Sequence, residues 1–418
     1  MLPVYYVGCH LMLENLVGQS ASKSIIADIK NGKFPGAVLF AGSSCTGKLT
    51  AALEVARALS CNGDDKPHWL CECPSCLRHK ALNCSNLLLL GPRDCSLEIT
   101  AAKDSFIKSY RDNDTHLKAC RYLFLRSIRK LTLRFSGILW EGEPNLSKLA
   151  PLMEKINENL ELIDFPRDLP PFDETVKICG ELEADALKLE SDFLYDSIPV
   201  NQIRNMEKWA CLHADEGKKT VIIENAESMQ VSVRNALLKI LEEPPADCVF
   251  ILLTTRRNAI METILSRVRT YNFMDRPLSV QQDVIKRVFH NEYFQGEINE
   301  FLLTFLPVPA DKIRAQSKNF FDGIVHGKIP DCEALVKACA SFEPRVEFKI
   351  FLNGITDYVR PVMQTMAGTQ ACVELSKTLR QTWENVTLYN QSVKAALECL
   401  IRDVNKINVL YGRVFSQI

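Results

Sequence analysis

A phosphate-binding loop is the first part of this sequence whose residues suggest chemistry. Gly42 and Gly47 have the spacing of such a loop, and Lys48 follows the second glycine. The glycines let backbone N–H groups turn toward phosphate oxygens at the start of a helix, where Lys48 would reach the β- and γ-phosphates. The motif then requires Ser or Thr to ligate Mg²⁺, but Leu49 stands there and Thr50 comes one residue late. The sequence therefore predicts a phosphate loop that lacks one metal ligand.

Four of the sixteen cysteines form a second candidate site, because they fall within a short stretch of the chain. Cys73 and Cys76 are separated by two residues, the spacing of a knuckle that offers two thiolates to a tetrahedral Zn²⁺. Cys61 and Cys71 precede them closely enough to complete a site of four thiolates. Scattered cysteines are usually small buried hydrophobic residues, whereas clusters are typical of metal binding. We predict a structural zinc site here, with free or partly buried thiols as the alternative.

The elements that must position these residues alternate between strands and helices, as in a parallel α/β sheet. Apolar runs predict strands at 38–41, 87–90, 220–223 and 249–253. Helical spacing and amphipathic patterns predict helices at 20–31, 50–60, 200–214 and 232–241. The phosphate loop then joins a buried strand to a helix, which is the context that its motif requires.

A long block at 93–197 separates the two halves of this pattern and carries no recognisable chemistry. The block is mostly helical by pattern, and its helix at 117–133 mixes Leu and Tyr with basic residues. The basic residues are Arg121, Arg126, Arg129 and Lys130, with Arg134 directly after the helix. Such a helix could face DNA or a partner subunit, although a solvated face is the commoner outcome for a run of charges. We predict a large helical insertion of unknown role.

The bulk properties are those of a soluble globular chain of two or three domains. It has 418 residues, a formal net charge of −1, 47% hydrophobic residues and 24% charged residues. The near-zero charge disfavours a protein that coats nucleic acid on its own. No stretch approaches the ~18 apolar residues that a membrane span needs, and no signal-peptide pattern is present. We expect a cytoplasmic protein without membrane contact, whose patternless residues 1–11 precede a more natural start near Met12.

Several motifs together resemble one known family. The stretch NALLKILEEPP at 235–245 precedes a strand that ends near Thr254, and a Ser-Arg pair follows at Arg267. Val17 opens a Val-Gly-Gln triplet before the phosphate loop and the cysteines. In this order the motifs resemble the bacterial clamp-loader branch of the AAA+ ATPases, which comprises the gamma/tau and delta-prime subunits of DNA polymerase III.

This resemblance implies a fold and a function. It covers about residues 12–92 and 198–275, with a weaker fit in the helical tail, and does not cover the block between them. It implies an AAA+ P-loop domain at 1–92 and 198–275 with a zinc module at about 61–76, the helical insertion at 93–197, an all-α lid at 276–335 and an all-α collar at 336–418. It further implies a hetero-oligomeric ring of subunits that loads a sliding clamp on primed DNA, with ATP bound between neighbouring subunits.

Two departures from the family indicate that hydrolysis is lost. Active members carry Asp-Glu after the strand at 220–223, Asp for Mg²⁺ and Glu to polarise the attacking water. This chain has Glu224 and Asn225, and an Asn amide is a poor general base. Together with Leu49, these changes favour a delta-prime-type subunit with weak or absent ATP and Mg²⁺ binding. The alternatives are an active gamma/tau-type ATPase that uses Thr50 and Glu224 for Mg²⁺, and a module that binds DNA or a partner through its insertion and zinc knuckle.

The resemblance assigns roles to further residues. Arg267 matches the arginine finger that reaches the γ-phosphate of a neighbouring subunit's ATP, although Val268 replaces the family's Cys. A surface Arg in a turn is the alternative for this position. Thr254 stands at a sensor position, where its hydroxyl would bond phosphate or water, or only cap the strand. Val17 belongs to the degenerate nucleotide-binding set, and the family's cysteine spacing would place one ligand at Leu70.

Overall fold

The computed structural model describes residues 13–63, 68–214, 217–342, 345–387, 389 and 391–417. The predicted lead-in at 1–11 lies outside the described residues. The chain divides into two compact units between Leu302 and Leu303. This boundary falls inside the segment that the resemblance assigns to a lid.

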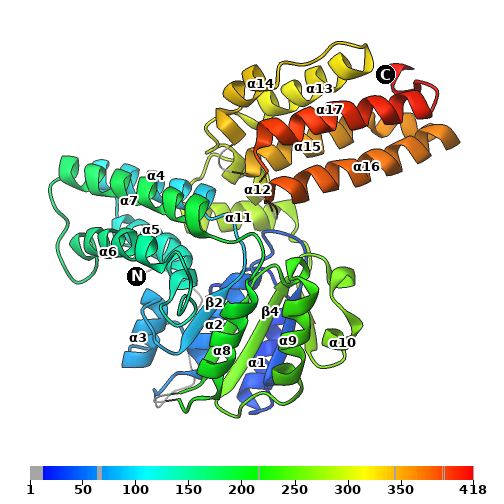
Figure 1. The fold of residues 1–418 in the computed structure, drawn as a ribbon. Coiled ribbons are helices and arrows are strands. Elements are labelled where there is room, and N and C mark those ends of the chain that lie inside the picture. Colours follow the sequence, from blue (N-terminus) through cyan, green and yellow to red (C-terminus); the bar gives the residue numbers. More distant parts are fainter. Residues whose placement is uncertain are drawn as a thin grey trace. The chain divides into compact units, whose positions relative to one another are not determined.

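The first unit contains a five-stranded sheet in which every neighbouring pair is parallel (Figure 1). Its strand order is β2-β3-β4-β1-β5. The strands are β1 Ala37–Ala41, β2 Leu87–Leu90, β3 Lys219–Ile223, β4 Cys248–Thr254 and β5 Arg269–Asn272. Four of them confirm the apolar runs in the sequence, and the α/β class with a parallel sheet is confirmed. The strand β5 is not predicted by the sequence, because this partly exposed edge strand has no apolar run.

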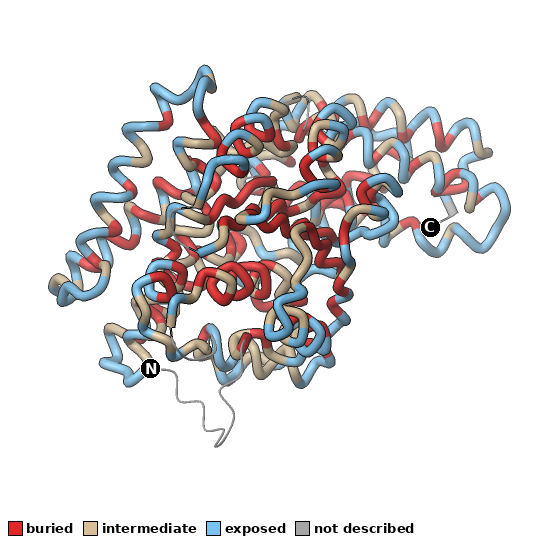
Figure 2. Tube along the Cα trace, turned by 90° about the horizontal axis from the view of Figure 1, so that it is seen from below, coloured by how far each residue is buried: buried red, intermediate tan, exposed pale blue. Residues whose placement is uncertain are grey.

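Side chains of alternate strand residues enter two different hydrophobic cores. Val38 and Phe40 of β1 lie in the core on one face of the sheet, and Leu39 lies in the core on the other face. The first face is covered by α1 Ala21–Lys30 and α2 Lys48–Leu59, and the second by α8 Val200–Cys211 and α9 Val231–Glu242. Buried residues follow the strands and the helix surfaces that pack on them (Figure 2). Fully buried parallel strands explain the continuous apolar runs.

The block at 93–197 is helical and shares the core of the second sheet face. Its helices are α4 Ser96–Arg111, α5 Leu117–Thr132, α6 Leu146–Leu162 and α7 Phe172–Phe193. Phe106, Phe124 and Trp140 are nearly inaccessible and belong to the same cluster as Leu39 of the sheet. The block is therefore packed as part of the first unit.

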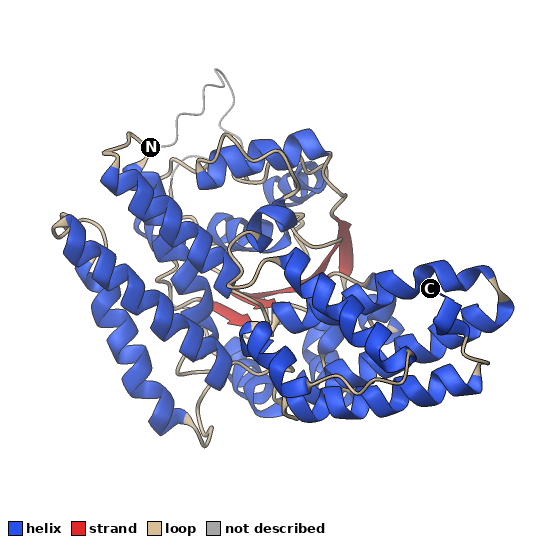
Figure 3. Ribbon diagram, turned by 90° about the horizontal axis from the view of Figure 1, so that it is seen from above, coloured by secondary structure: helices blue, strands red, loops and turns tan. Residues whose placement is uncertain are grey.

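Helices form the rest of the regular structure in the described residues (Figure 3). In the first unit these are α3 Pro74–Ala81, α10 Glu262–Leu265 and α11 Leu278–Phe289, and α12 Ile298–Leu303 ends at the boundary. The second unit contains α13 Ala310–Val325, α14 Cys332–Ala338, α15 Val346–Val359, α16 Met366–Thr387 and α17 Val393–Leu410. Among the described residues, no helix has both the length and the apolar character that a membrane crossing requires.

A buried carboxyl group lies in the aromatic core of the second unit. Glu347 is 0% exposed on α15, beside a cluster that includes Phe342 and Phe348. Its Oε1 accepts a hydrogen bond from the Val308 N–H at 3.4 Å, and its Oε2 has no partner among the described residues. Burial raises the pKa of Glu347 from 4.5 to about 7. The folded unit therefore holds this proton more tightly than the unfolded chain does.

This proton makes the stability of the second unit depend on pH. As pH rises from about 4.5 to about 7, the unfolded carboxyl ionises first, so unfolding becomes more favourable. Glu347→Gln is expected to flatten this dependence, measured as hydrogen-exchange protection of α13 and α15 at several pH values. Glu398→Gln, an exposed change on α17, is the control and should leave the dependence in place. Equal slopes for the wild type and Glu347→Gln would contradict the prediction.

Candidate nucleotide-binding and metal-binding sites

The phosphate loop lies at the carboxyl ends of the parallel strands, where α/β sheets usually bind ligands. Gly42 follows β1, and its N–H donates to Thr254 O at the end of β4 at 3.2 Å. A Cβ on Gly42 would lie 2.2 Å from Phe273 O, so the neighbouring backbone requires glycine there. Gly47 caps α2 with a φ of +88°, a conformation that side chains disfavour. The predicted glycine roles are thus structural as well as ligand-related.

The Lys48 ammonium group is held by carbonyls of its own loop. Its Nζ donates to Gly42 O at 2.7 Å and to Ser43 O at 2.5 Å. Burial lowers the pKa of Lys48 from 10.5 to about 8. Lys48 therefore already has two carbonyl partners within the loop where it would meet a phosphate.

Leu49 is part of the hydrophobic core, with 6% of its surface exposed. Leu49 is the second residue of α2, and it belongs to the core cluster that contains Val38 and Phe40 of β1. Thr50 lies one residue farther along and is half-buried. The place of the usual metal-binding hydroxyl is taken by an apolar side chain.

Glu224 follows β3 and has both carboxylate oxygens in ion pairs. Its Oε1 accepts from Arg93 Nη1 at 3.0 Å, and its Oε2 pairs with Arg134. Glu224 is 8% exposed and Arg134 is 2% exposed. Each oxygen of this carboxylate is thus engaged by one guanidinium group in a charge-assisted hydrogen bond.

A second carboxylate extends this ion-pair network. Glu98 on α4 pairs with Arg93 at 2.7 Å and with Lys130 on α5. Burial alone would raise its pKa, but Lys130 and Arg93 hold the pKa of Glu98 well below its usual value. The network joins the ends of β2 and β3 to two helices of the insertion.

Asn225 is also occupied by the protein. It adopts a left-handed conformation with φ +49°, and its Nδ2 donates to Pro92 O at 2.7 Å. With Leu49 apolar and Glu224 paired twice, the residues at the metal position do not fit Mg²⁺. Hard cations require free oxygen ligands, which these side chains do not offer.

Thr254, the predicted sensor residue, bonds a carboxylate that the sequence analysis missed. Its Oγ1 donates to Glu227 Oε2 at 2.7 Å, and the Thr255 N–H donates to Glu227 Oε1 at 3.1 Å. Glu227 is 8% exposed and contributes to the electrostatic field at Lys48. The only sequence signal for Glu227 is its place three residues after Glu224. This signal is weak, because acidic residues are common after strands.

Val17 is connected to the phosphate loop by Arg276, an arginine that the sequence analysis did not single out. Arg276 donates from Nε to Val17 O at 2.9 Å and from Nη1 to Cys45 O at 2.8 Å. A Cβ on Gly47 would lie 2.7 Å from the same guanidinium. Arg276 therefore ties the segment before α1 to the loop, and it is 9% exposed.

Arg267 lies apart from this network, in the turn between α10 and β5. Its Nη1 donates to Thr263 O at 2.8 Å, and its Nη2 pairs with Glu242 at 3.3 Å. The side chain is 29% exposed, and its partner Glu242 is 61% exposed. The guanidinium is thus held at the surface by weak contacts that a ligand could replace.

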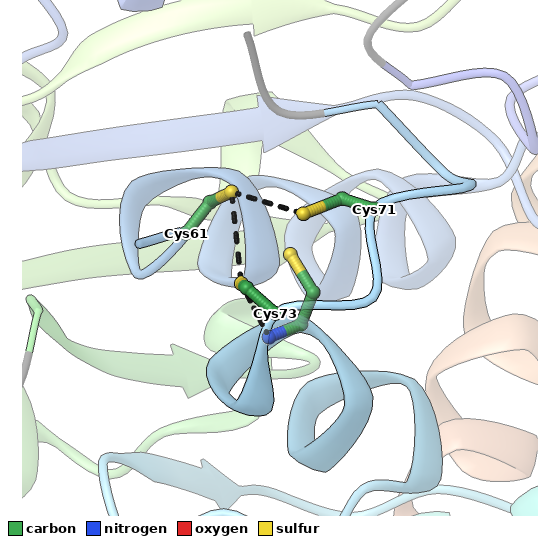
Figure 4. Close-up of side chains that lie close together, drawn as sticks. Cys61, Cys71 and Cys73 are labelled. Atoms are coloured by element: carbon green, nitrogen blue, oxygen red, sulfur yellow. Dashed lines mark hydrogen bonds between the residues drawn. The ribbon is translucent and has the colours of Figure 1, made fainter. Parts of the chain in front are cut away.

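The four predicted cysteines lie together. Figure 4 shows three of them, Cys61, Cys71 and Cys73. The sulfur atoms of Cys61 and Cys71 are 3.7 Å apart, and those of Cys61 and Cys73 are 4.0 Å apart. All four Sγ atoms, including that of Cys76, lie within 4.8 Å of one another. Tetrahedral Zn–S bonds of about 2.3 Å place ligand sulfurs about 3.8 Å apart. The group could therefore hold a metal ion, and this donor set fits zinc.

Helix and charge contacts support this group. Cys73 caps α3 and accepts from the Cys76 N–H at 3.4 Å. Burial would raise the pKa of Cys73, but hydrogen bonds from the backbone of Cys76 and Asn62 lower it to about 6. Arg57, which is 1% exposed, lies 3.5 Å from Cys76 Sγ. Leu70, at the position favoured by the family spacing, is exposed.

The basic side chains of α5 point into the protein. Arg126 and Tyr122 donate to Lys80 O, and Arg129 donates to Ala81 O at 3.1 Å, at the carboxyl end of α3. Positive groups are favourable there because helix carbonyls carry partial negative charge.

Arg121 is also bonded internally. It is 6% exposed, and its Nε donates to Ile163 O at 2.7 Å. The solvated face expected from the sequence was therefore wrong for these arginines, which are bonded within the protein. The helical periodicity of 117–133 correctly predicts α5, but the hydrogen-bond partners of its arginines lie in distant segments of the chain.

The fold and the loop together define a P-loop domain of the nucleotide-binding type. The chain belongs to the clamp-loader family of DNA polymerase III subunits: the family model described as "DNA polymerase III, delta subunit" matches residues 18–131 and 166–277, more than half of its length. The match includes most of the block at 93–197, so the expectation that the family likeness omits this block was wrong. Within the matched span, the gap is 132–165.

Individual relatives are similar over short segments. The DNA polymerase III subunit delta' of Pseudomonas aeruginosa is 36% identical over 100 residues, which are 21% of this chain and 30% of the relative. The delta' subunit of Bacillus subtilis is 32% identical over 93 residues, 22% of this chain and 28% of the relative. The tau subunit of Bacillus subtilis is 46% identical over 55 residues, 13% of this chain and 10% of the relative. The matched segments therefore span less than a third of these relatives.

A solved structure has a low similarity to this chain. A gamma subunit-related protein from Thermotoga maritima is 18% identical, over 50% of this chain and 79% of its own. Its TM-score of 0.28 is too low for a comparison of the folds.

Gly91, directly after β2, lies so close to the backbone after β3 that we expect it to tolerate no side chain. A Cβ there would lie 2.2 Å from Glu224 O, and the φ of +101° disfavours any side chain. Gly91→Ala is expected to lower the free energy of unfolding by roughly 2–4 kcal/mol, measured by urea denaturation. Gly137→Ala is the control, because no atom lies within 4 Å of its Cβ position. A Gly91→Ala protein as stable as the control would contradict the prediction.

Proposed function

We propose that this chain is a delta-prime-like subunit of the DNA polymerase III clamp loader, which loads the sliding clamp on primed DNA. In this proposal it does not hydrolyse ATP and supplies Arg267 to the nucleotide of a neighbouring subunit in a hetero-oligomeric ring. The observation that carries the proposal is the double ion pair of Glu224 with Arg93 and Arg134. A strand-end carboxylate in this state is not available to a metal ion.

The lack of hydrolysis follows from three occupied positions. Leu49 supplies no hydroxyl, Glu224 supplies no free oxygen, and the Asn225 amide is bonded to Pro92 O. Hydrolysis of a nucleoside triphosphate needs a metal ion to neutralise phosphate charge and a group to orient water. The gamma/tau-type alternative, with Mg²⁺ held by Thr50 and Glu224, would require at least one of the two Glu224 ion pairs to break.

The role of Arg267 rests on its exposure. A finger must reach a phosphate of the neighbouring subunit. The Arg267 side chain is 29% exposed and has one ion pair, to the exposed Glu242, which it can give up at small cost. The alternative of a DNA-binding or partner-binding insertion has less support, because the arginines of α5 are bonded internally.

The remaining assignments are parts of the same proposal. The cysteine group holds a structural Zn²⁺, and any ATP and Mg²⁺ are bound by the neighbouring subunit. The first unit contains the AAA+ domain, residues 276–335 act as a lid, and residues 336–418 act as a collar that joins subunits. A cytoplasmic location suits a protein of replication.

The purified chain is expected to show no ATP turnover above that of Lys48→Ala. The physical reason is the missing metal site beside the loop. The measurement is phosphate release with Mg²⁺, together with binding of a fluorescent ATP analogue with and without Mg²⁺. Turnover that Lys48→Ala abolishes would instead support the gamma/tau-type alternative.

Arg267→Ala is expected to slow ATP hydrolysis at the neighbouring subunit's site in the assembled complex by about 10³-fold, as for arginine fingers in other phosphoryl-transfer enzymes. Arg257→Ala, a change at another exposed arginine of this unit, serves as the control. Gel filtration must show that both variants assemble. Normal turnover in an assembled Arg267→Ala complex would remove the finger role.

The zinc proposal predicts one zinc ion per chain, measured by elemental analysis of protein purified under reducing conditions. The double change Cys73→Ser and Cys76→Ser should remove the ion and lower the melting temperature, because two thiolate ligands are lost. Cys84→Ser is the control, since Cys84 lies outside the four-cysteine group. Full zinc content in the double variant would contradict the assignment.

A further inference from the structure

The ion pairs at Glu224 suggest a specific role for the insertion. We propose that Arg134, together with Arg93, permanently occupies the place of the divalent cation beside Glu224, so that the protein supplies its own positive charge at this strand end. This inference concerns the chain's own site and does not depend on whether Arg267 acts on a neighbouring subunit.

The charges match those of the ion that they replace. Each guanidinium brings one positive charge to a different oxygen of Glu224, and together they bring the formal charge of Mg²⁺. Glu224 and Arg134 are both more than 90% buried, where an unpaired carboxylate would be costly. Some cation is therefore required at this position in the folded protein.

The position of Arg134 is set by contacts on all sides. Its Nε donates to Gly91 O at 3.2 Å, and its Nη1 donates to Lys130 O at 2.5 Å. Its own carbonyl accepts a hydrogen bond from Trp140 Nε1 at 3.0 Å. Trp140 is 1% exposed, so the arginine is anchored at both its backbone and its guanidinium. A side chain held in this way is a permanent occupant of the site.

The family comparison supports the same conclusion. Arg134 lies in the segment 132–165, the gap within the span that the family model matches. Glu224 lies within the matched part. Leu49 offers no hydroxyl to a metal ion, and Arg134 brings a positive charge to Glu224 from the unmatched segment. The positive charge beside Glu224 therefore comes from the side chains of Arg93 and Arg134.

The test compares melting temperatures of four variants with and without Mg²⁺ or Mn²⁺. The variants are Arg134→Ala, Glu224→Gln, the double variant, and Arg129→Ala as the control. Arg129 lies on α5 and pairs with Asp164, so its removal matches the loss of an arginine in the same region. Ala at position 134 leaves room for an added cation.

Arg134→Ala is expected to lower the melting temperature by about 10 °C, more than the control does, because Glu224 loses a buried partner. The double variant should melt higher than Arg134→Ala, since a neutral amide needs no cation. Added Mn²⁺ or Mg²⁺ should raise the melting temperature of Arg134→Ala by several degrees, and should not stabilise the wild type or the double variant.

Three results would overturn the proposal. The first is a loss in Arg134→Ala no larger than in Arg129→Ala, and the second is a loss that added cations do not restore. The third is Mn²⁺ bound to the wild type, detected by electron paramagnetic resonance, that Glu224→Gln removes. This last measurement uses the wild type, so it decides the question even if Arg134→Ala does not fold.

Discussion

The negative charge of Glu224, enclosed at the ends of two parallel strands, is the constraint on which the centre of the first unit depends. Because the carboxylate is nearly inaccessible, it must be neutralised within the protein. Arg93 and Arg134 provide that charge, and Glu98 and Lys130 balance and orient the arginines. The insertion therefore supplies positive charge that the carboxyl ends of β2 and β3 require.

This constraint explains how α5 is used. Its arginines bond the carboxyl end of α3, and α3 begins at Cys73 of the cysteine group. Lys130 near its end, with Arg134 just beyond the helix, carries the contacts to Glu98 and Glu224. One helix thus packs against both the predicted metal module and the modified phosphate-loop site. Arg267 lies outside this network, which leaves its guanidinium at the surface.

Much of the fold was predictable because its signals are local. Four apolar runs of four or five residues became buried parallel strands, and the loop between β1 and α2 had its expected context. The cysteine group was also predictable, because close spacing brings thiols together. The sequence did not predict the edge strand β5, because its residues are largely polar. It also gave no role to Glu227 and Arg276, because both act through contacts with residues far away in sequence. The partners of the α5 arginines could not be read from charge alone.

The sequence by itself determined the sheet class, the missing hydroxyl at Leu49, the four neighbouring thiols and the presence of an arginine at position 267. These properties depend on residue type and short spacing, which the chain carries without folding. Only the tertiary structure decided what surrounds Glu224. Arg93 and Arg134 are separated from it by 131 and 90 residues, and only packing of the insertion on the sheet brings their charges to one carboxylate. Long-range electrostatic pairing of this kind has no signature in local sequence.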